Sequence, residues 1–302
     1  MRTRNVALVA LLLAALLFVG AWAIQISVGV EADREAAAFD LQSMAAVSTA
    51  AENPEYEDIT STISGRTYRI FVSLPLSYGT DAADPAGYRV VYLLDGNWHS
   101  VLATEVAQLA NFGGDLDELI IVAIGYPTED DNVIMAERAF DYLPGPTGVE
   151  GGAADFLAFI EGELVPHINT TYETREKDRT LAGHSYGGFF TFYALFHNEG
   201  TFDTFMVMSP ALWYADKVAF DYEEAYAADN KTLPVDLYFS VGENEPENMS
   251  QLFMVSNLVE LYNTMEARHY GKLEMEMVIF DGVGHASSVP GALSGGMIAT
   301  AN

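Results

Sequence analysis

Short apolar runs without polar alternation constrain the fold of this 302-residue chain more than any other feature. They span residues 89–96, 119–125, 179–183 and 204–209. Successive side chains of a strand point to opposite sides of a sheet. A strand that is apolar throughout is therefore typical of a sheet buried on both faces, as in parallel sheets.

Further segments complete an alternating pattern. Strand patterns also cover residues 67–75, 236–242 and 274–280, and helical patterns cover residues 100–111, 153–168, 187–197 and 251–269. Strands that alternate with helices predict an α/β fold, in which a mostly parallel central sheet has helices on both faces. Ligands bind at the carboxyl ends of the strands in such sheets, so functional residues are expected in the loops that follow strands.

The N-terminal part of the chain differs from the rest. Residues 1–23 place two arginines before an apolar run and end in an Ala-x-Ala sequence, which predicts a signal peptide. Because apolar character continues in patches to Val30, an uncleaved membrane anchor is the alternative. Residues 24–57 predict a tether and residues 58–302 a single folded domain. We expect an exported protein, either periplasmic or secreted, or anchored in the inner membrane.

The composition excludes several classes of function. With 43 acidic and 14 basic residues, the formal net charge is −29, which argues against nucleic acid as a partner because phosphate backbones are repelled. The absence of cysteine excludes disulfides, thiolate metal sites and a cysteine nucleophile. The sequence shows neither a metal-ligand cluster nor a nucleotide-binding glycine loop after a strand, so no cofactor and no metal are expected.

The stretch RTLAGHSYGG carries a Gly-x-Ser-x-Gly pattern with Ser185 at its centre. It joins the strand at residues 179–183 to the helix at 187–197, which is the context of a nucleophile elbow. Gly183 and Gly187 permit the tight turn, where a Cβ atom would clash. We predict that Ser185 is a catalytic nucleophile; a plain glycine-rich turn is the alternative.

A serine hydroxyl is a weak nucleophile and needs a general base. His285 follows the strand at residues 274–280, so its loop is expected at the same edge of the sheet as Ser185. We therefore predict His285 as the base. His184 is expected to pack against the sheet or other loops, because neighbouring residues of an elbow point apart. Three further histidines fall within or at the ends of predicted helices and are interpreted as surface residues: His167, His197 and His269.

A carboxylate is expected to orient the base. In the nucleophile-elbow architecture the chain order is serine, acid, histidine, and the loop after residues 236–242 offers Glu243 and Glu245. Glu245 has more reach from the strand end and is preferred. Glu243, an acid elsewhere and a site with only serine and histidine remain alternatives.

The oxyanion that forms during acyl transfer needs hydrogen-bond donors. The backbone N–H of Tyr186, directly after the serine, is one candidate. The second is expected from the loop after an earlier strand, and we predict the backbone N–H of Asn97 in YLLDGNWHS. A simple turn at Asp95-Gly96 is the alternative.

Several motifs together resemble the esterase branch of the α/β-hydrolases that includes enterochelin-type esterases, S-formylglutathione hydrolases, feruloyl esterases and mycolyltransferases. The likeness covers about residues 60–295 and is strongest to periplasmic esterases that cut siderophore trilactones. The matching motifs are YLLDGN (92–97), ERAFDYLP (137–144), GHSYGG (183–188), SPALWY (209–214), VGENE (241–245) and GHASSVPGAL (284–293).

The resemblance implies an α/β-hydrolase fold and an acyl-serine mechanism. It also implies that Arg138 faces the substrate and that Trp213 lines the pocket; a structural salt bridge and core packing are the respective alternatives. The charge of the chain departs from what this resemblance implies. A triply anionic catecholate siderophore favours basic residues near the site, whereas this chain is strongly acidic and has only four lysines.

We therefore predict an exported serine carboxylic-ester hydrolase with a Ser-His-Glu triad that acts on a small or siderophore-like ester. An acyltransferase with the same machinery and a non-catalytic binding protein of the same fold are the alternatives. The intact set of Ser185, His285 and VGENE argues against the latter.

Overall fold

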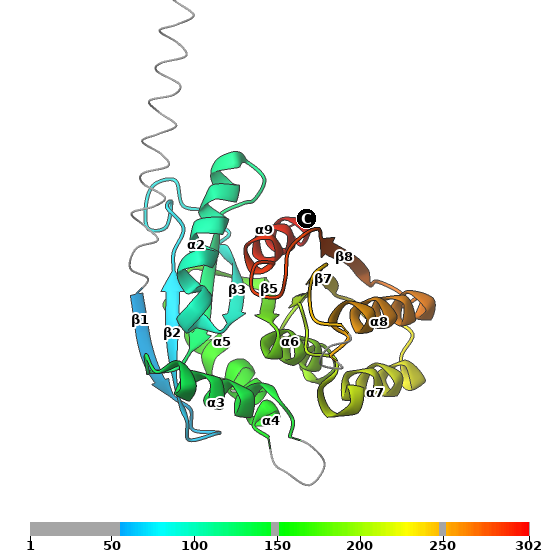
Figure 1. The fold of residues 1–302 in the computed structure, drawn as a ribbon. Helices are drawn as coiled ribbons and strands as arrows, with labels where there is room; N and C mark the ends of the chain where they lie inside the picture. The colour runs from blue at the N-terminus through cyan, green and yellow to red at the C-terminus, as the bar shows by residue number, and fades with distance from the viewer. Residues whose placement is uncertain (1–54, 146–150, 248–251, 302) are drawn as a thin grey trace, which may run out of the picture. The chain divides into compact units, whose positions relative to one another are not determined.

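The computed structural model describes residues 55–145, 151–247 and 252–301, all within the compact unit Ala50–Asn302 (Figure 1). The predicted signal peptide or anchor at residues 1–23 lies outside the described residues, as does the predicted tether up to residue 54. In the part of the chain that is described, no helix has the length and apolar character needed to cross a bilayer.

A single eight-stranded sheet forms the centre of the unit, in the order β1-β2-β4-β3-β5-β6-β7-β8. The strands β3 to β8 run parallel, whereas β1 and β2 pair antiparallel at one side of the sheet. The strands are β1 (Glu55–Thr60), β2 (Thr67–Ser73), β3 (Tyr88–Leu94), β4 (Leu119–Gly125), β5 (Thr174–His184), β6 (Thr204–Met208), β7 (Asp236–Gly242) and β8 (Glu274–Phe280). The predicted α/β-hydrolase fold, with a mostly parallel sheet, is confirmed.

Two strands extend beyond what the apolar pattern indicates. β1 begins at Glu55, before the domain boundary that the sequence predicts at residue 58, and its exposed edge position explains why it lacks an apolar run. β5 starts at Thr174 rather than at residue 179, because its polar first half still pairs with the beginning of β3 through Thr174 and Tyr88.

Helices cover both faces of the sheet (Figure 1). Three of them, α3, α7 and α9, lie outside the helical segments that the sequence predicts. The helices are α2 (Gly96–Gly113), α3 (Asp131–Tyr142), α4 (Ala153–Phe159), α5 (Val165–Thr171), α6 (Tyr186–His197), α7 (Tyr214–Asp229), α8 (Met254–Arg268) and α9 (Val289–Ala299), with the π-helical turn η1 (Ile160–Leu164) between α4 and α5.

The strand β3 shows why its sequence has no polar alternation. Val91 and Leu93 point into the core beneath α2 and α9, whereas Val90, Tyr92 and Leu94 point into the larger core under the remaining helices. Each of these five residues is at most 1 % exposed. Each buried side chain of this size stabilises the fold by roughly 1.5–3 kcal/mol, so both faces of the strand favour apolar residues.

The parallel strands bring distant residues together at one edge of the sheet. Asp95 follows β3, Ser185 follows β5, Ser209 follows β6 and Glu245 lies in the turn after β7. These residues therefore share the carboxyl edge of the sheet, which is the edge where α/β folds bind ligands.

Candidate active site

Ser185 lies in a strained turn between β5 and α6, with φ 62° and ψ −116°. A non-glycine residue with such angles costs of order 1–3 kcal/mol and persists only where its surroundings hold it. Here the backbone N–H of Ser185 donates to the carbonyl of Met208 at 3.0 Å, and its own carbonyl accepts from Phe189 and Ala211. Neighbouring elements therefore hold the elbow in place.

Close backbone approach requires two of the three glycines in GHSYGG, Gly183 and Gly188. A Cβ atom on Gly183 would lie 2.3 Å from the carbonyl oxygen of Gly187, and one on Gly188 would lie 2.5 Å from the carbonyl oxygen of Met208. Both distances are far below van der Waals contact. The strand, the helix and the elbow between them can pack this tightly only without these side chains. The predicted clash at Gly187 is not found, because a Cβ atom there would lie 3.3 Å from Oδ2 of Asp95 and meet no backbone atom closely.

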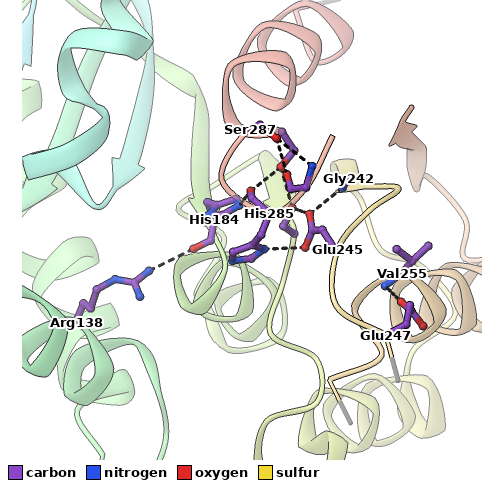
Figure 2. Close-up of polar contacts among 11 residues, drawn as sticks. Arg138, His184, Gly242, Glu245, Glu247, Val255, His285 and Ser287 are labelled. Atoms are coloured by element: carbon purple, nitrogen blue, oxygen red, sulfur yellow. Dashed lines mark hydrogen bonds and ion pairs between the residues drawn. The ribbon is translucent and has the colours of Figure 1, made fainter. Parts of the chain in front are cut away.

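His285 and Glu245 meet although 40 residues separate them along the chain (Figure 2). The Nδ1 atom of His285 lies 2.7 Å from Oε2 of Glu245, whose side chain is fully buried. A carboxylate only accepts hydrogen bonds, so Nδ1–H donates and the free Nε2 carries the lone pair. This is the tautomer that a general base needs.

The other oxygen of Glu245 is also fully engaged. Its Oε1 accepts from the hydroxyl of Ser209 at 2.6 Å and from the backbone N–H of Gly242 at 2.8 Å. A buried carboxylate is stable only when hydrogen bonds replace its lost water. Three donors from three segments thus fix the orientation of Glu245.

Glu243 lies elsewhere, although the sequence leaves it open as an alternative to Glu245. It is exposed, and its Oε2 accepts from the backbone N–H of Gly282 at 3.0 Å. The structure therefore brings Glu245, and not Glu243, to the imidazole of His285.

Two further groups hold His285 from the backbone side. Nε2 of His184 lies 3.0 Å from the carbonyl oxygen of His285, and the hydroxyl of Ser288 donates to the same oxygen at 2.8 Å. Burial, together with the nearby rings of His285 and His99, lowers the pKa of His184 well below its usual range. Because a carbonyl oxygen only accepts hydrogen bonds, His184 donates through Nε2. The sequence indicated only that it would pack against the sheet or loops.

Ser185 and His285 line one cavity of about 370 Å³ at the carboxyl edge of the sheet. Within the described residues their side chains form no direct hydrogen bond with each other. Catalytic contacts of this kind are often long in a protein without substrate. The cavity has room for an ester beside the serine hydroxyl.

Tyr186 and Asn97 occupy equivalent places at the beginnings of two helices. Tyr186 is the first residue of α6, and Asn97 lies in the first turn of α2. Backbone N–H groups in the first turn lack an acceptor within the helix. The side chain of Asn97 is committed elsewhere, since it accepts from Tyr126 at 2.7 Å and donates to the carbonyls of Tyr126 and Thr128. The role predicted for Asn97 in an oxyanion hole concerns its backbone N–H alone, and it stays a prediction.

Arg138 reaches the cavity but forms a buried ion pair with Asp95. Its Nε and Nη2 atoms each lie 2.7 Å from a carboxylate oxygen of Asp95, and Nη2 also lies 3.4 Å from the carbonyl oxygen of His184 (Figure 2). Burial lowers the pKa of Arg138, but the neighbouring Asp95 carboxylate outweighs this and raises it overall. One guanidinium thus links the loop after β3 to the residue before Ser185.

Removing the Arg138 side chain should destabilise the fold strongly. Arg138→Met leaves the carboxylate of Asp95 buried and uncompensated, so the free energy of unfolding should fall by about 3–5 kcal/mol. Lys217→Met is the matched control, because its ion pair with Glu260 is exposed and should contribute less than about 1 kcal/mol. Urea unfolding of both variants measures the two losses. Equal losses would contradict a structural role for the buried pair.

Trp213 and Trp98 differ in their relation to the cavity. Trp213 is half-buried, packs against the core and has its ring centroid 6.1 Å from that of Tyr186, but it is not among the residues that line the cavity of Ser185. The predicted contact of Trp213 with substrate stays a prediction. Trp98 does line the cavity. The sequence could have indicated Trp98 as a residue of the site, because it comes directly after YLLDGN, in the loop that follows a buried strand.

The described residues contain no group of three or more potential metal ligands that could hold an ion. The histidines near Ser185 instead pack ring against ring: the ring centroid of His184 lies 4.4 Å from that of His285 and 6.3 Å from that of His99.

Comparison with known proteins identifies the family. The family model described as "Putative esterase" matches residues 61–275. The chain is 31 % identical over 252 residues to the ferri-bacillibactin esterase BesA of Bacillus subtilis, covering 78 % of this chain and 85 % of that protein. It is 30 % identical over 276 residues to the siderophore enterobactin esterase of Emericella nidulans, covering 78 % and 89 %. The crystal structure of the BES protein from Bacillus cereus superposes with a TM-score of 0.72 at 30 % identity, covering 83 % and 95 %.

Proposed function

Because the chain belongs to the esterase family of α/β-hydrolases and is a carboxylic-ester hydrolase, we propose that it cleaves siderophore esters through an acyl-serine intermediate. We further propose that Ser185 is the nucleophile, His285 the general base and Glu245 the orienting acid. The observation that carries this assignment is the 2.7 Å contact of His285 Nδ1 with the buried Glu245 carboxylate, beside the cavity of the strained Ser185.

Acylation follows from the arrangement of the three side chains. Ser185 Oγ attacks the ester carbonyl carbon while Nε2 of His285 takes the hydroxyl proton. The imidazolium that forms is stabilised by the carboxylate of Glu245. The tetrahedral oxyanion accepts hydrogen bonds from the backbone N–H groups of Tyr186 and Asn97.

Release of the two products uses the same groups in sequence. Collapse of the tetrahedral intermediate breaks the bond to the alkoxy group, and His285 returns its proton to the leaving alcohol. Water then attacks the acyl-serine with His285 again as base, which frees the acid and restores Ser185. If an added alcohol takes the place of water, the product is a new ester, and product analysis in the presence of such an acceptor measures this transfer.

Export of the protein is part of the proposal and rests on the sequence of residues 1–23, with its two arginines, apolar run and Ala-x-Ala end. Siderophore esters are proposed as substrates because two of the relatives are named as siderophore esterases.

A serine-directed probe tests the nucleophile directly. We expect a fluorophosphonate to label the folded protein at Ser185, with p-nitrophenyl butyrate hydrolysis lost in parallel, because the probe reacts with an activated serine. Mass spectrometry of the labelled peptide identifies the residue. Folded protein that takes up no label would refute the proposed mechanism. Hydrolysis of a metal-free siderophore trilactone by the same protein tests the substrate class.

A further inference from the structure

The cavity beside Ser185 has a mainly apolar wall. Its polar or charged lining residues are Asp95, His99, Arg138, His184, Ser185 and His285, and the larger part of its surface is hydrocarbon. The apolar lining residues are Trp98, Leu102, Met135, Ala286, Val289 and Pro290. A substrate group that enters the cavity therefore exchanges water mostly for apolar contact, which favours groups that are poorly hydrated.

The wall offers no net positive charge. Among the described residues that line the cavity, Arg138 is the one basic side chain of the Lys and Arg type, and its charge is balanced by Asp95 at 2.7 Å. Two lysines, Lys177 and Lys272, lie near the beginnings of β5 and β8, at the opposite edge of the sheet from Ser185. The chain as a whole carries a formal net charge of −29. An anionic group would thus enter an acidic protein without a free cation to receive it.

One aromatic side chain of the wall is held rigidly. Nε1 of Trp98 donates to the carboxylate of Asp131 at 2.9 Å, and the guanidinium of Arg138 lies 5.5 Å from the indole ring centroid. The side chain is nevertheless 38 % exposed. An aromatic surface that is already fixed loses little conformational entropy when a ligand packs on it. Trp98 is therefore suited to bind an apolar or aromatic part of a substrate.

We infer that the cavity selects electrically uncharged esters that carry an apolar or aromatic group, that Trp98 is the residue against which this group packs, and that anionic esters are poor substrates. This inference rests on the proposed esterase function and specifies the substrate class of the same site. For a tris-catechol trilactone, it favours the metal-free form with protonated phenols over the ferric complex, which is an anion.

Two esters of similar length test the selection by charge. We expect kcat/KM for p-nitrophenyl butyrate to exceed that for p-nitrophenyl hemisuccinate by at least about tenfold, because the carboxylate of the latter is desolvated without a partner. The ratio should shrink as salt is added, since salt screens the repulsion from the acidic protein. Equal values of kcat/KM for the two esters would overturn the inference.

A charge placed at the wall should reverse this preference. Met135 is 46 % exposed, so Met135→Lys can be tolerated, and we expect it to raise kcat/KM for the hemisuccinate about tenfold relative to the butyrate. Phe112→Lys is the matched control, because Phe112 is 42 % exposed on α2 and does not line the cavity. An equal change in both variants would assign the effect to overall charge and contradict the inference.

Removal of the aromatic wall tests the role of Trp98. We expect Trp98→Ala to lower kcat/KM for p-nitrophenyl benzoate about tenfold, and Trp98→Phe to restore most of it. An equal loss with p-nitrophenyl acetate still supports the inference, because it places the shared p-nitrophenyl group on Trp98. Leu109→Ala, which changes an exposed residue of the same helix outside the cavity, should leave both esters unaffected. Unchanged turnover of both esters by Trp98→Ala would overturn the assignment.

The trilactone gives a direct comparison on the proposed substrate. We expect the metal-free form to be cleaved at least about tenfold faster than its ferric complex at equal concentration. Failure of this inference differs from failure of the proposed function. If the neutral esters are hydrolysed and Ser185 is labelled but no charge preference appears, only the inference falls. If the neutral esters are not hydrolysed and Ser185 takes no label, the proposed function itself falls.

Discussion

Ser185→Ala should lower kcat for p-nitrophenyl butyrate by a factor on the order of 10⁵ or more, because the variant has no hydroxyl to form the acyl-enzyme. Its fold should be retained. Alanine takes the same strained backbone angles as serine, and the three backbone hydrogen bonds that hold the elbow do not involve the side chain. Stopped or single-turnover assays measure the loss, and circular dichroism with urea unfolding measures the fold.

The matched control is Ser256→Ala, which removes an exposed serine from α8, far along the chain from the elbow. It should keep both full activity and fluorophosphonate labelling. If Ser185→Ala retained substantial turnover of the folded protein, the acyl-serine mechanism would have to be abandoned.

Glu245→Gln should lower kcat by a factor on the order of 10⁴, with a much smaller change in KM. The amide cannot supply the charge that stabilises the imidazolium, and its NH₂ group can turn toward Nδ1 and favour the wrong tautomer. The fold should persist, because the remaining carbonyl oxygen can still accept from Ser209 and Gly242. A steady-state assay of kcat and KM separates this effect from a loss of substrate binding.

Glu243→Gln provides the comparison for this prediction. Glu243 is exposed and contacts the backbone of Gly282 rather than His285, so its neutral form should change kcat by less than about threefold. A large effect from Glu243→Gln, or a small one from Glu245→Gln, would show that the acid has been assigned to the wrong side chain.

Local patterns in the sequence predict the central strands well, and physical reasons explain where they fail. Strands β3, β4 and β6 are buried on both faces, and their apolar runs show it. The edge strand β1 buries little surface and leaves no such run. Helix α9 is apolar and rich in glycine, so it shows no helical periodicity, and its packing against α2, β6 and β7 appears only in three dimensions.

Some residues of the site could likewise be predicted from local sequence, and others could not. The Gly-x-Ser-x-Gly pattern between a strand and a helix is a local feature, and so is a histidine in the loop after the last strand. By contrast, the resemblance implies that Arg138 faces the substrate, with a structural salt bridge as the alternative. The structure shows it at the cavity wall with its charge balanced by Asp95, 43 positions earlier. Trp98 was present in a motif quoted for its backbone, yet its place in the cavity depends on its contacts with Asp131 and Arg138 of α3.

The sequence by itself determined the fold class, the family and the positions of Ser185 and His285 in the loops at one edge of the sheet. These depend on periodicity and short motifs, which are properties of neighbouring residues. Only the tertiary structure decided that Glu245 rather than Glu243 meets His285, that Trp98 is fixed at the cavity wall, and that the described lining residues include no free cation. Such contacts join segments 33 to 40 residues apart, and side-chain direction across that separation is set by packing of the whole sheet and its helices.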